Sequence, residues 1–159
     1  MRKLCVIALL TLTACGPTAW TGGVTVDGRA FPPAQAGERI RMCNLPGGNI
    51  QDVLAQRRAI ARSDQQFELC GYVASAHTTF FSLPNVCAAP GTEGWFHGAS
   101  SLAHAPMPAW NVNLTRHYGP WLTGWFNTHA AHLVGNNYAP LPAEEIAARG
   151  EARICNDGE

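Results

Sequence analysis

Two successive segments of this chain each run from an apolar strand through a glycine-containing loop into a helix. The first, residues 39–62, places Pro46-Gly47-Gly48 between an alternating strand and a helical pattern. The second, residues 67–81, places Gly71 and then Ser75 between a strand and a small-residue helical segment. Strands that alternate with helices pair in parallel, so the chain is expected to adopt an α/β fold with flanking helices.

The remaining pattern adds short elements and no second domain boundary. Without its first 14 residues the chain keeps roughly 145, which is the size of one ordinary domain. We therefore expect a single α/β domain over residues 24–159. Further strands are predicted at 24–26, 85–89 and 94–97, and further helices at 121–133 and 143–149.

The first 14 residues have the pattern of an export signal. Arg2 and Lys3 precede an apolar run that is too short to span a bilayer. The run closes with Leu12-Thr13-Ala14-Cys15, which resembles the lipobox of bacterial lipoproteins. The resemblance implies cleavage before Cys15, lipid on its thiol and amine, a tether over 15–23 and anchoring in the cell envelope. Gly16 favours the periplasmic face of the outer membrane.

The charged residues exclude several classes of function. Removal of Arg2 and Lys3 leaves a slightly negative chain, so nucleic acid is not an expected partner and the membrane is reached through the lipid on Cys15. Lys3 is the only lysine in the sequence, which rules out a serine–lysine dyad in the mature chain. No cofactor is expected, and no protein or peptide partner is identified.

Four cysteines remain for the exported domain: Cys43, Cys70, Cys87 and Cys155. An oxidising compartment favours two disulfides among them. Four cysteines allow three connectivities, and all three stay open. No C-x-x-C pair brings two thiolates together, so the pattern does not favour zinc.

The order of several short motifs resembles a known superfamily. Pro46-Gly47-Gly48, Gly71-x-x-Ala74-Ser75-Ala76, Phe96-His97 and the stretch from Ala143 to Gly150 look like the Clp protease proteolytic subunit and its crotonase-like relatives. The chain is more closely similar to small exported bacterial proteins of that superfamily, over about residues 40–155. The resemblance implies a small Clp/crotonase-like fold with a shortened N-terminal part, because little chain precedes Arg39.

The resemblance also implies roles for the motif residues. Ser75 would be the nucleophile at a helix start, and His97 would take its proton as a general base. The N–H groups of Gly48 and Ala76, with Gly47, would hold an oxyanion. Without the resemblance, Ser75 is more typical of a helix N-cap and His97 of a hydrogen-bonded core residue.

Two departures from the family affect the proposed chemistry. Where the protease subunit has an aspartate, this chain has Asn136 and Asn137, which can orient His97 but cannot offset an imidazolium charge. His77 stands where the small exported relatives commonly have cysteine, so their disulfide arrangement is not carried over. His77 is a rival base in principle, but two residues along a helix points its side chain to another face than Ser75.

Three functions remain after these considerations. The first is a membrane-tethered periplasmic serine hydrolase that acts on peptide or acyl substrates. The second is a catalytically inactive relative that serves as a binding or envelope-assembly module. The third is a metal-binding lipoprotein, because His129 and His132 lie on one helical face, although no acid or third histidine is evident beside them and no metal ligands are assigned.

Overall fold

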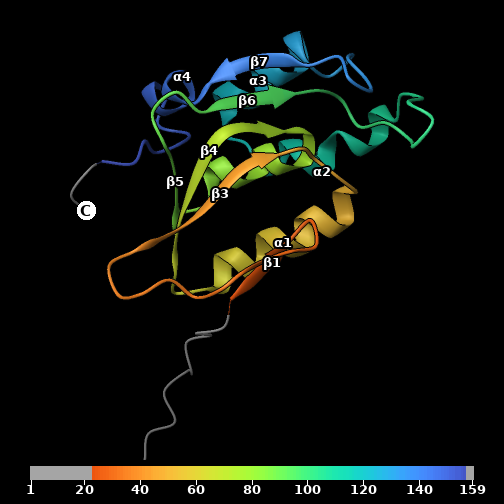
Figure 1. The fold of residues 1–159 in the computed structure, drawn as a ribbon. Coiled ribbons are helices and arrows are strands. Elements are labelled where there is room, and N and C mark those ends of the chain that lie inside the picture. Colours follow the sequence, from red (N-terminus) through yellow and green to blue (C-terminus); the bar gives the residue numbers. More distant parts are fainter. Residues whose placement is uncertain (1–22, 157–159) are drawn as a thin grey trace, which may run out of the picture.

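The computed structural model describes residues 23–156 of the chain (Figure 1). The expected signal peptide at 1–14, the lipidation site Cys15 and the tether except Gly23 lie outside the described residues, as do residues 157–159. Within that range no helix has the length and apolar character needed to cross a membrane.

A mixed sheet forms the centre of the fold, and its strand order is β3-β4-β6-β7, with β5 paired to part of β4. Both β3 and β6 run parallel to β4, as does β5, whereas β7 pairs antiparallel with β6. Outside this sheet, β1 and β2 form a small antiparallel pair. The strands are β1 (Val24–Val26), β2 (Arg29–Phe31), β3 (Arg39–Leu45), β4 (Gln66–Ala74), β5 (Val86–Ala88), β6 (Glu93–Phe96) and β7 (Ala139–Pro142).

Four α-helices and two 3₁₀ segments join the described strands. They are α1 (Ile50–Arg62), η1 (Ser75–Ser82), η2 (Pro108–Trp110), α2 (Val112–Thr115), α3 (Pro120–His129) and α4 (Ala143–Ala148). The α/β class and the parallel pairing expected from the sequence are therefore confirmed. The antiparallel strand β7 was not expected.

The first strand–loop–helix unit forms where the sequence indicates it, whereas the predicted loop after Gly71 is wrong: β4 continues through Gly71 to Ala74 and turns directly into the 3₁₀ segment η1. In β3 buried and more exposed residues alternate, with Ile40 and Met42 facing the core. The following helix α1 begins at a proper cap, because the side chain of Asn49 accepts from the backbone N–H of Gln51 at 2.9 Å. β4 then returns parallel to β3, and α1 supplies the crossover that such pairing requires.

The apolar faces of these elements meet in one core. Its fully buried large side chains come from β3, β4, β6, α1, η1, α2, α3 and α4, so nearly every element contributes to it. The members of largest volume are Phe67, Phe80, Phe96, Phe126 and Met42.

Helix α3 is shorter than the sequence predicts and is capped from far away in the chain. It ends at His129 and not at Leu133, and a turn closes at Ala130. At its other end the Glu151 carboxylate accepts from the N–H groups of Trp121 at 2.8 Å and Leu122 at 3.0 Å. A carboxylate there satisfies free donors and faces the positive end of the helix.

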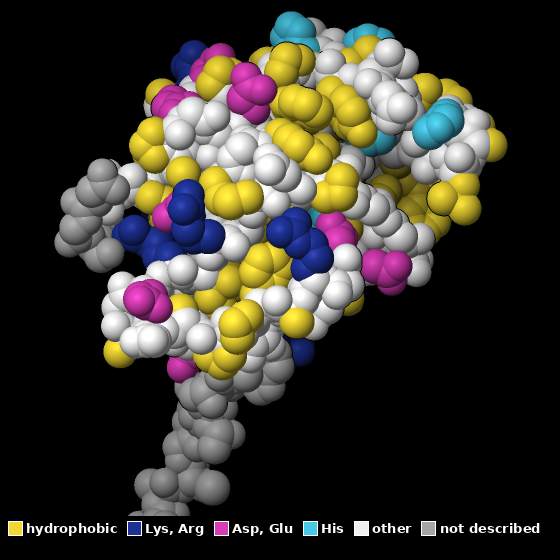
Figure 2. All heavy atoms as spheres, in the orientation of Figure 1, with side chains coloured by type: hydrophobic (Ala, Val, Ile, Leu, Met, Phe, Trp, Pro, Cys, Tyr) yellow, Lys and Arg dark blue, Asp and Glu magenta, His cyan; other side chains and the backbone are white. Residues whose placement is uncertain are grey.

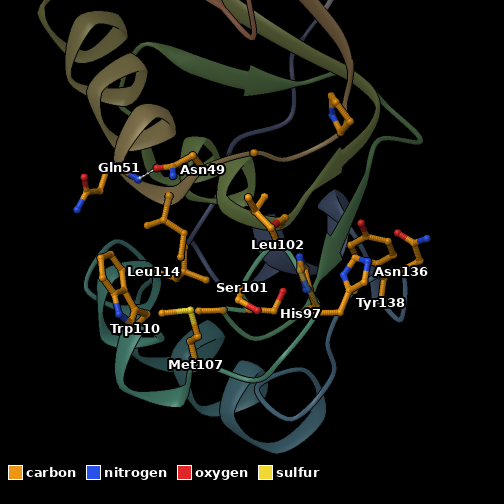
Figure 3. A pocket seen from close by; sticks show the side chains of 18 residues that line it. Asn49, Gln51, His97, Ser101, Leu102, Met107, Trp110, Leu114, Asn136 and Tyr138 are labelled. Atoms are coloured by element: carbon orange, nitrogen blue, oxygen red, sulfur yellow. Dashed lines mark hydrogen bonds between the residues drawn. The ribbon is translucent and has the colours of Figure 1, made fainter.

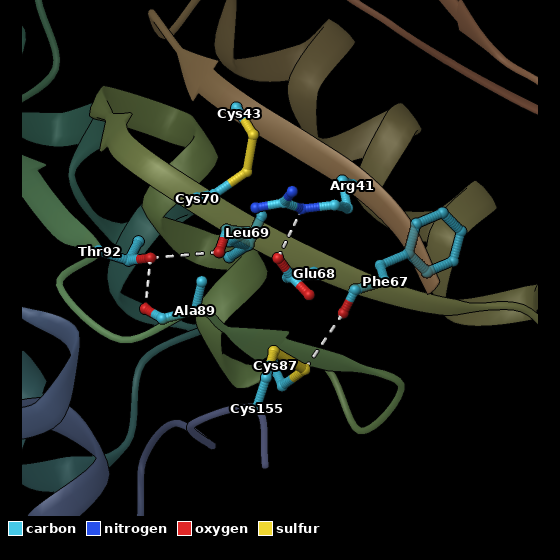
Figure 4. A network of polar contacts seen from close by, with 10 residues as sticks. All are labelled: Arg41, Cys43, Phe67, Glu68, Leu69, Cys70, Cys87, Ala89, Thr92 and Cys155. Atoms are coloured by element: carbon cyan, nitrogen blue, oxygen red, sulfur yellow. Dashed lines mark hydrogen bonds and ion pairs between the residues drawn. A yellow bond between two sulfur atoms is a disulfide. The ribbon is translucent and has the colours of Figure 1, made fainter. Parts of the chain in front are cut away.

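The cysteines form the pairs Cys43–Cys70 and Cys87–Cys155 (Figure 4). Cys43 and Cys70 are register partners on adjacent parallel strands, with Cα atoms 4.4 Å apart. The second disulfide joins β5 to the C-terminal segment, with Cα atoms 5.1 Å apart. The expected pair of disulfides is thus confirmed, and the connectivity that the sequence left open is resolved.

Hydrophobic side chains gather on the surface over β6 and β7 (Figure 2). In this region the ring of Trp95 stacks on Tyr72 at 4.7 Å between centroids and meets Tyr138 at 5.7 Å. Lower on the sheet, Arg41 and Glu68 form an ion pair of 2.7 Å. This face of the sheet carries partly exposed side chains, whereas the opposite face packs into the core.

Candidate functional site

A pocket of about 590 Å³ lies where three parallel strands end. β3 ends before Pro46, β4 ends before Ser75 and β6 ends before His97, and all three residues line the pocket. Ligand sites in open α/β sheets commonly form outside the carboxyl ends of the strands. The carboxyl ends of β3, β4 and β6 therefore converge on one cavity.

The structure brings together only some of the residues that the sequence singled out. Ser75, His97, Gly48 and Asn136 line the pocket, whereas Gly47, Ala76 and Asn137 are not among its lining residues. The remainder of the lining is Pro46, Asn49, Ile50, Gln51, Ala99, Ser100, Ser101, Leu102, His104, Met107, Trp110, Leu114, Gly135 and Tyr138.

Ser75 adopts a backbone conformation that L-residues rarely adopt. Its φ is +55°, at the point where β4 turns into η1. Left-handed backbone outside glycine costs roughly 1 kcal/mol and is concentrated at functional positions. Its hydroxyl has no hydrogen-bond partner among residues 23–156, whereas its carbonyl accepts from the Thr78 hydroxyl at 2.6 Å. The serine is thus held by its backbone, and its Oγ is left unpaired at the pocket.

Gly47 packs directly against this serine. A Cβ at position 47 would lie 2.6 Å from the Ser75 Cβ, and Gly47 has φ of +95°, so only glycine fits. Its N–H donates to Nδ1 of His77 at 3.1 Å. Gly47 therefore shapes the loop, and its N–H is already engaged and does not supply the oxyanion contact expected from the sequence.

His77 is fully buried and connects three segments that are distant in sequence. Besides accepting from Gly47, its Nε2 lies 3.2 Å from Gln56 Oε1 and 3.3 Å from Asp27 Oδ1. A proton on Nε2 satisfies both oxygens while Nδ1 accepts. Burial lowers the pKa of His77, and the Asp27 carboxylate opposes part of that shift. No hydrogen bond joins His77 to Ser75 in the described chain, so it holds the Gly47 loop in place.

His97 is 8% exposed, and its Nδ1 is buried without a hydrogen-bond partner in the described residues. Burial lowers the pKa of His97, and the neighbouring His104 lowers it further. The ring stands edge-on to Tyr138, with centroids 4.9 Å apart. His97 is thus a neutral imidazole near pH 7, able to accept a proton, and it carries one unpaired polar atom.

Neither Asn136 nor Asn137 hydrogen-bonds to His97, so neither orients its ring as the resemblance implied. The Asn137 amide donates to the Val134 carbonyl at 3.1 Å. The ring of Tyr138 contacts His97 in their place. Tyr138 was not singled out from the sequence, because nothing local marks it as a neighbour of a histidine 41 positions earlier.

Two groups at the pocket carry partial positive charge, although the lining contains no Lys or Arg. The N-terminal residues of α1, from Asn49 to Gln51, line it, and the N-terminus of a helix carries partial positive charge. The N–H of Gly48 has no acceptor within residues 23–156. Ala76 is fully buried, at the start of η1. Gly48 is therefore the oxyanion donor that this geometry favours.

Metal ligation finds no support in the described chain. No group of three or more His, Cys, Asp or Glu side chains there is close enough to hold an ion. His129 packs its ring near Trp125, with centroids 5.2 Å apart.

Figure 3 shows how the pocket is divided. His97, Asn136 and Tyr138 lie toward one side, and Met107, Trp110 and Leu114 lie toward the other. The latter three come from one continuous stretch that includes η2 and α2. This apolar side was missed at the sequence level because the stretch has no regular period.

Comparisons with known proteins give no family for the chain: no family model matches it, and no curated protein matches it.

Proposed function

We propose that this chain is a serine hydrolase that transfers acyl groups to water, with Ser75 as nucleophile and His97 as general base. The observation that carries the proposal is the convergence of Ser75, His97 and Gly48 on one pocket from three separate strand ends. The order of these motifs, which resembles the Clp and crotonase-like superfamily, supports the same function. Membership of the chain in that superfamily is part of what we propose.

The chemistry follows from the roles of the three groups. Ser75 Oγ attacks the carbonyl carbon while His97 takes the hydroxyl proton, and the N–H of Gly48 and the end of α1 stabilise the oxyanion. The bond to the leaving group then breaks, and His97 gives its proton to that group. Water then attacks the carbonyl carbon of the acyl group while His97 takes a proton from the water. The bond to Ser75 Oγ breaks, and His97 returns the proton to the serine.

Two features make the proposed catalyst a slow one. No carboxylate of the described residues accepts from His97 Nδ1, and loss of the orienting acid from a triad lowers the rate by about 10⁴-fold. No hydrogen bond joins Ser75 to His97 before substrate binds. Catalytic hydrogen bonds are often long in unliganded enzymes and shorten in the complex, so the arrangement is compatible with activity.

A fluorophosphonate probe tests the proposal on the full chain in membranes of the expressing cells. The wild-type protein is expected to be labelled, Ser75→Ala to lose labelling, and His97→Ala to be labelled at least about 100-fold more slowly. Ser82→Ala and His129→Ala are matched controls outside the pocket lining, and they should label as wild type does. Labelling that survives in Ser75→Ala, or its absence from the wild type, would favour the inactive binding module.

The membrane tether is a separate part of the proposal. It is supported by the lipobox-like sequence that ends at Cys15. Growth with radiolabelled palmitate should label the wild-type chain and not Cys15→Ser, and labelled wild-type protein should fractionate with outer membranes. Equal labelling of both chains would refute lipidation at Cys15.

A further inference from the structure

The pocket lining carries no formal charge apart from what its two histidines can acquire. None of its described residues is Asp, Glu, Lys or Arg. An unpaired charge that leaves water for such a pocket loses several kcal/mol of solvation, and no charged side chain of the lining replaces it. The part of a ligand that enters the pocket is therefore uncharged.

The pocket lining combines polar groups that lack hydrogen-bond partners with a separate apolar side. Among the polar groups of the lining, the Ser75 hydroxyl and the Gly48 N–H have no hydrogen-bond partner within residues 23–156. On the apolar side, Met107, Trp110 and Leu114 line the pocket (Figure 3). A carbonyl attached to a hydrocarbon chain fits both, because its oxygen accepts hydrogen bonds and the chain packs against the apolar side.

An extended peptide fits this site less well than a hydrocarbon chain. Peptides commonly bind enzymes and receptors by adding a strand to a free sheet edge. β6, the strand that ends beside His97, is already paired with β4 on one side and β7 on the other. The outer strand β7 contains Pro140 and Pro142, which have no N–H to donate. The sheet edge beside His97 therefore offers a peptide few N–H donors, and the other edge strand of the described sheet, β3, is separated from β6 by β4.

We infer that the substrates of this site are uncharged acyl esters, with the aliphatic acyl chain lying against Met107, Trp110 and Leu114. This inference rests on the proposed function. In the reaction, the Ser75 Oγ forms a bond to the acyl carbon and the ester C–O bond breaks. The serine proton passes through His97 to the departing alcohol, and water then releases the carboxylic acid.

A chain-length series tests the substrate class with the full-length protein in phospholipid vesicles. Between 4-nitrophenyl acetate and the octanoate, kcat/KM is expected to rise at least about tenfold, because each methylene buried on the apolar side adds to binding. The singly charged succinate ester should react no faster than the acetate. A profile that is flat with chain length, or a faster succinate ester, would overturn the inference.

Two charged variants locate the chain within the pocket. Met107→Glu places a carboxylate on the apolar side and should lower the ratio of kcat/KM for the octanoate to kcat/KM for the acetate at least about tenfold. Val112→Glu introduces the same charge at an exposed apolar position outside the lining and should keep the preference. Equal effects of the two variants would overturn the assignment.

A binding measurement separates failure of this inference from failure of the proposed function. Octanamide should bind Ser75→Ala at least about tenfold more tightly than acetamide does, as measured by calorimetry, since this binding needs no catalysis. If octanamide binds and the wild type is not labelled by fluorophosphonate, the acyl specificity stands and the hydrolase is wrong. If the wild type is labelled and octanamide binds no better than acetamide, the hydrolase stands and the acyl specificity is wrong.

Discussion

Ser75 occupies a left-handed backbone position that glycine would occupy at lower cost. Its φ of +55° is imposed by the turn from β4 into η1, and Gly47 leaves just enough room for its Cβ. Strain of this kind persists where the surrounding structure determines it and where the side chain is needed. The presence of serine at this position is therefore better explained by a role of its hydroxyl than by a contribution to the stability of the fold.

This strain predicts an ordering of two variants. Ser75→Gly should be more stable than Ser75→Ala by about 1 kcal/mol, because alanine keeps the unfavourable conformation and glycine relieves it. Urea unfolding of both variants measures the difference. Equal stabilities would mean that the turn relaxes when the hydroxyl is removed.

The buried imidazole of His97 predicts how labelling depends on pH. Its pKa lies below the ordinary value of about 6.5, so the neutral, proton-accepting form predominates at pH 7. The labelling rate at Ser75 should be constant between about pH 7 and 8 and should decline only below about pH 6.5. If the labelling rate has already fallen by half when the pH is lowered from 8 to 7, His97 is not the base.

The same shift affects stability with a defined sign. Unfolded His97 takes up its proton at a higher pH than folded His97 does, so the free energy of unfolding decreases as pH falls below about 6.5. His77 and His117 act in the same direction, and burial and nearby arginines lower the pKa of His117 to about 4.

At the scale of the elements, Glu151 substitutes for an N-cap that α3 lacks. Gly119, at the N-cap position, has no side chain to offer, and the carboxylate of Glu151 accepts from the first N–H groups instead. The last stretch of chain thereby determines where α3 begins.

Removal of this carboxylate should destabilise the fold measurably. Glu151→Ala is expected to lower the free energy of unfolding by about 1–2 kcal/mol, since two helix N–H groups lose their acceptor. Urea unfolding provides the measurement. Glu145→Ala is the control, because that exposed carboxylate has no hydrogen-bond partner in the described chain, and its effect should be a few tenths of a kcal/mol. Similar losses in both variants would contradict the capping role.

Local patterns predicted the elements that local interactions determine. The strand–loop–helix unit from β3 to α1 forms as expected, because alternation, the Pro-Gly-Gly loop and the Asn49 cap all act within a few residues. β7 was not predicted, since Ala139–Pro142 contains two prolines and becomes a strand only by pairing with β6. Strand pairing over such sequence distances has no local signature.

The candidate site shows the same division. Ser75, His97 and Gly48 could be assigned from motif order, and all three reach the pocket. The role of His77 could not, because its partners Asp27, Gly47 and Gln56 come from three separate segments. The apolar side of the pocket could not be predicted either, because it depends on how the irregular stretch from Met107 to Leu114 folds.

At the scale of the whole molecule, the two disulfides constrain the chain to different extents. Their cysteines are 27 and 68 positions apart, so Cys87–Cys155 closes the longer loop. Closure of loops of these lengths restricts the unfolded chain by an amount equivalent to about 3–4 kcal/mol each. Much of the stability of the domain is therefore expected to depend on oxidation.

Reduction should reveal an order between the two disulfides. Cys43 is partly exposed, whereas Cys87 and Cys155 are both buried, so a mild reductant should open Cys43–Cys70 first. Alkylation followed by mass spectrometry identifies which cysteines react. Cys87–Cys155 should open more slowly, and opening of both at the same rate under native conditions would contradict this order.

The C-terminal segment that carries Glu151 and Cys155 has a consequence for how the chain acquires its structure during synthesis. Residues 151–155 cap α3, bridge to β5 through Ala88 and Ile154, and close the longer disulfide. During synthesis these residues leave the ribosome after α3 and β5, the elements that they contact. The cap of α3, the bridge to β5 and the longer disulfide can therefore form only after residues 151–155 have been synthesised, although β3, α1 and β4 are complete long before.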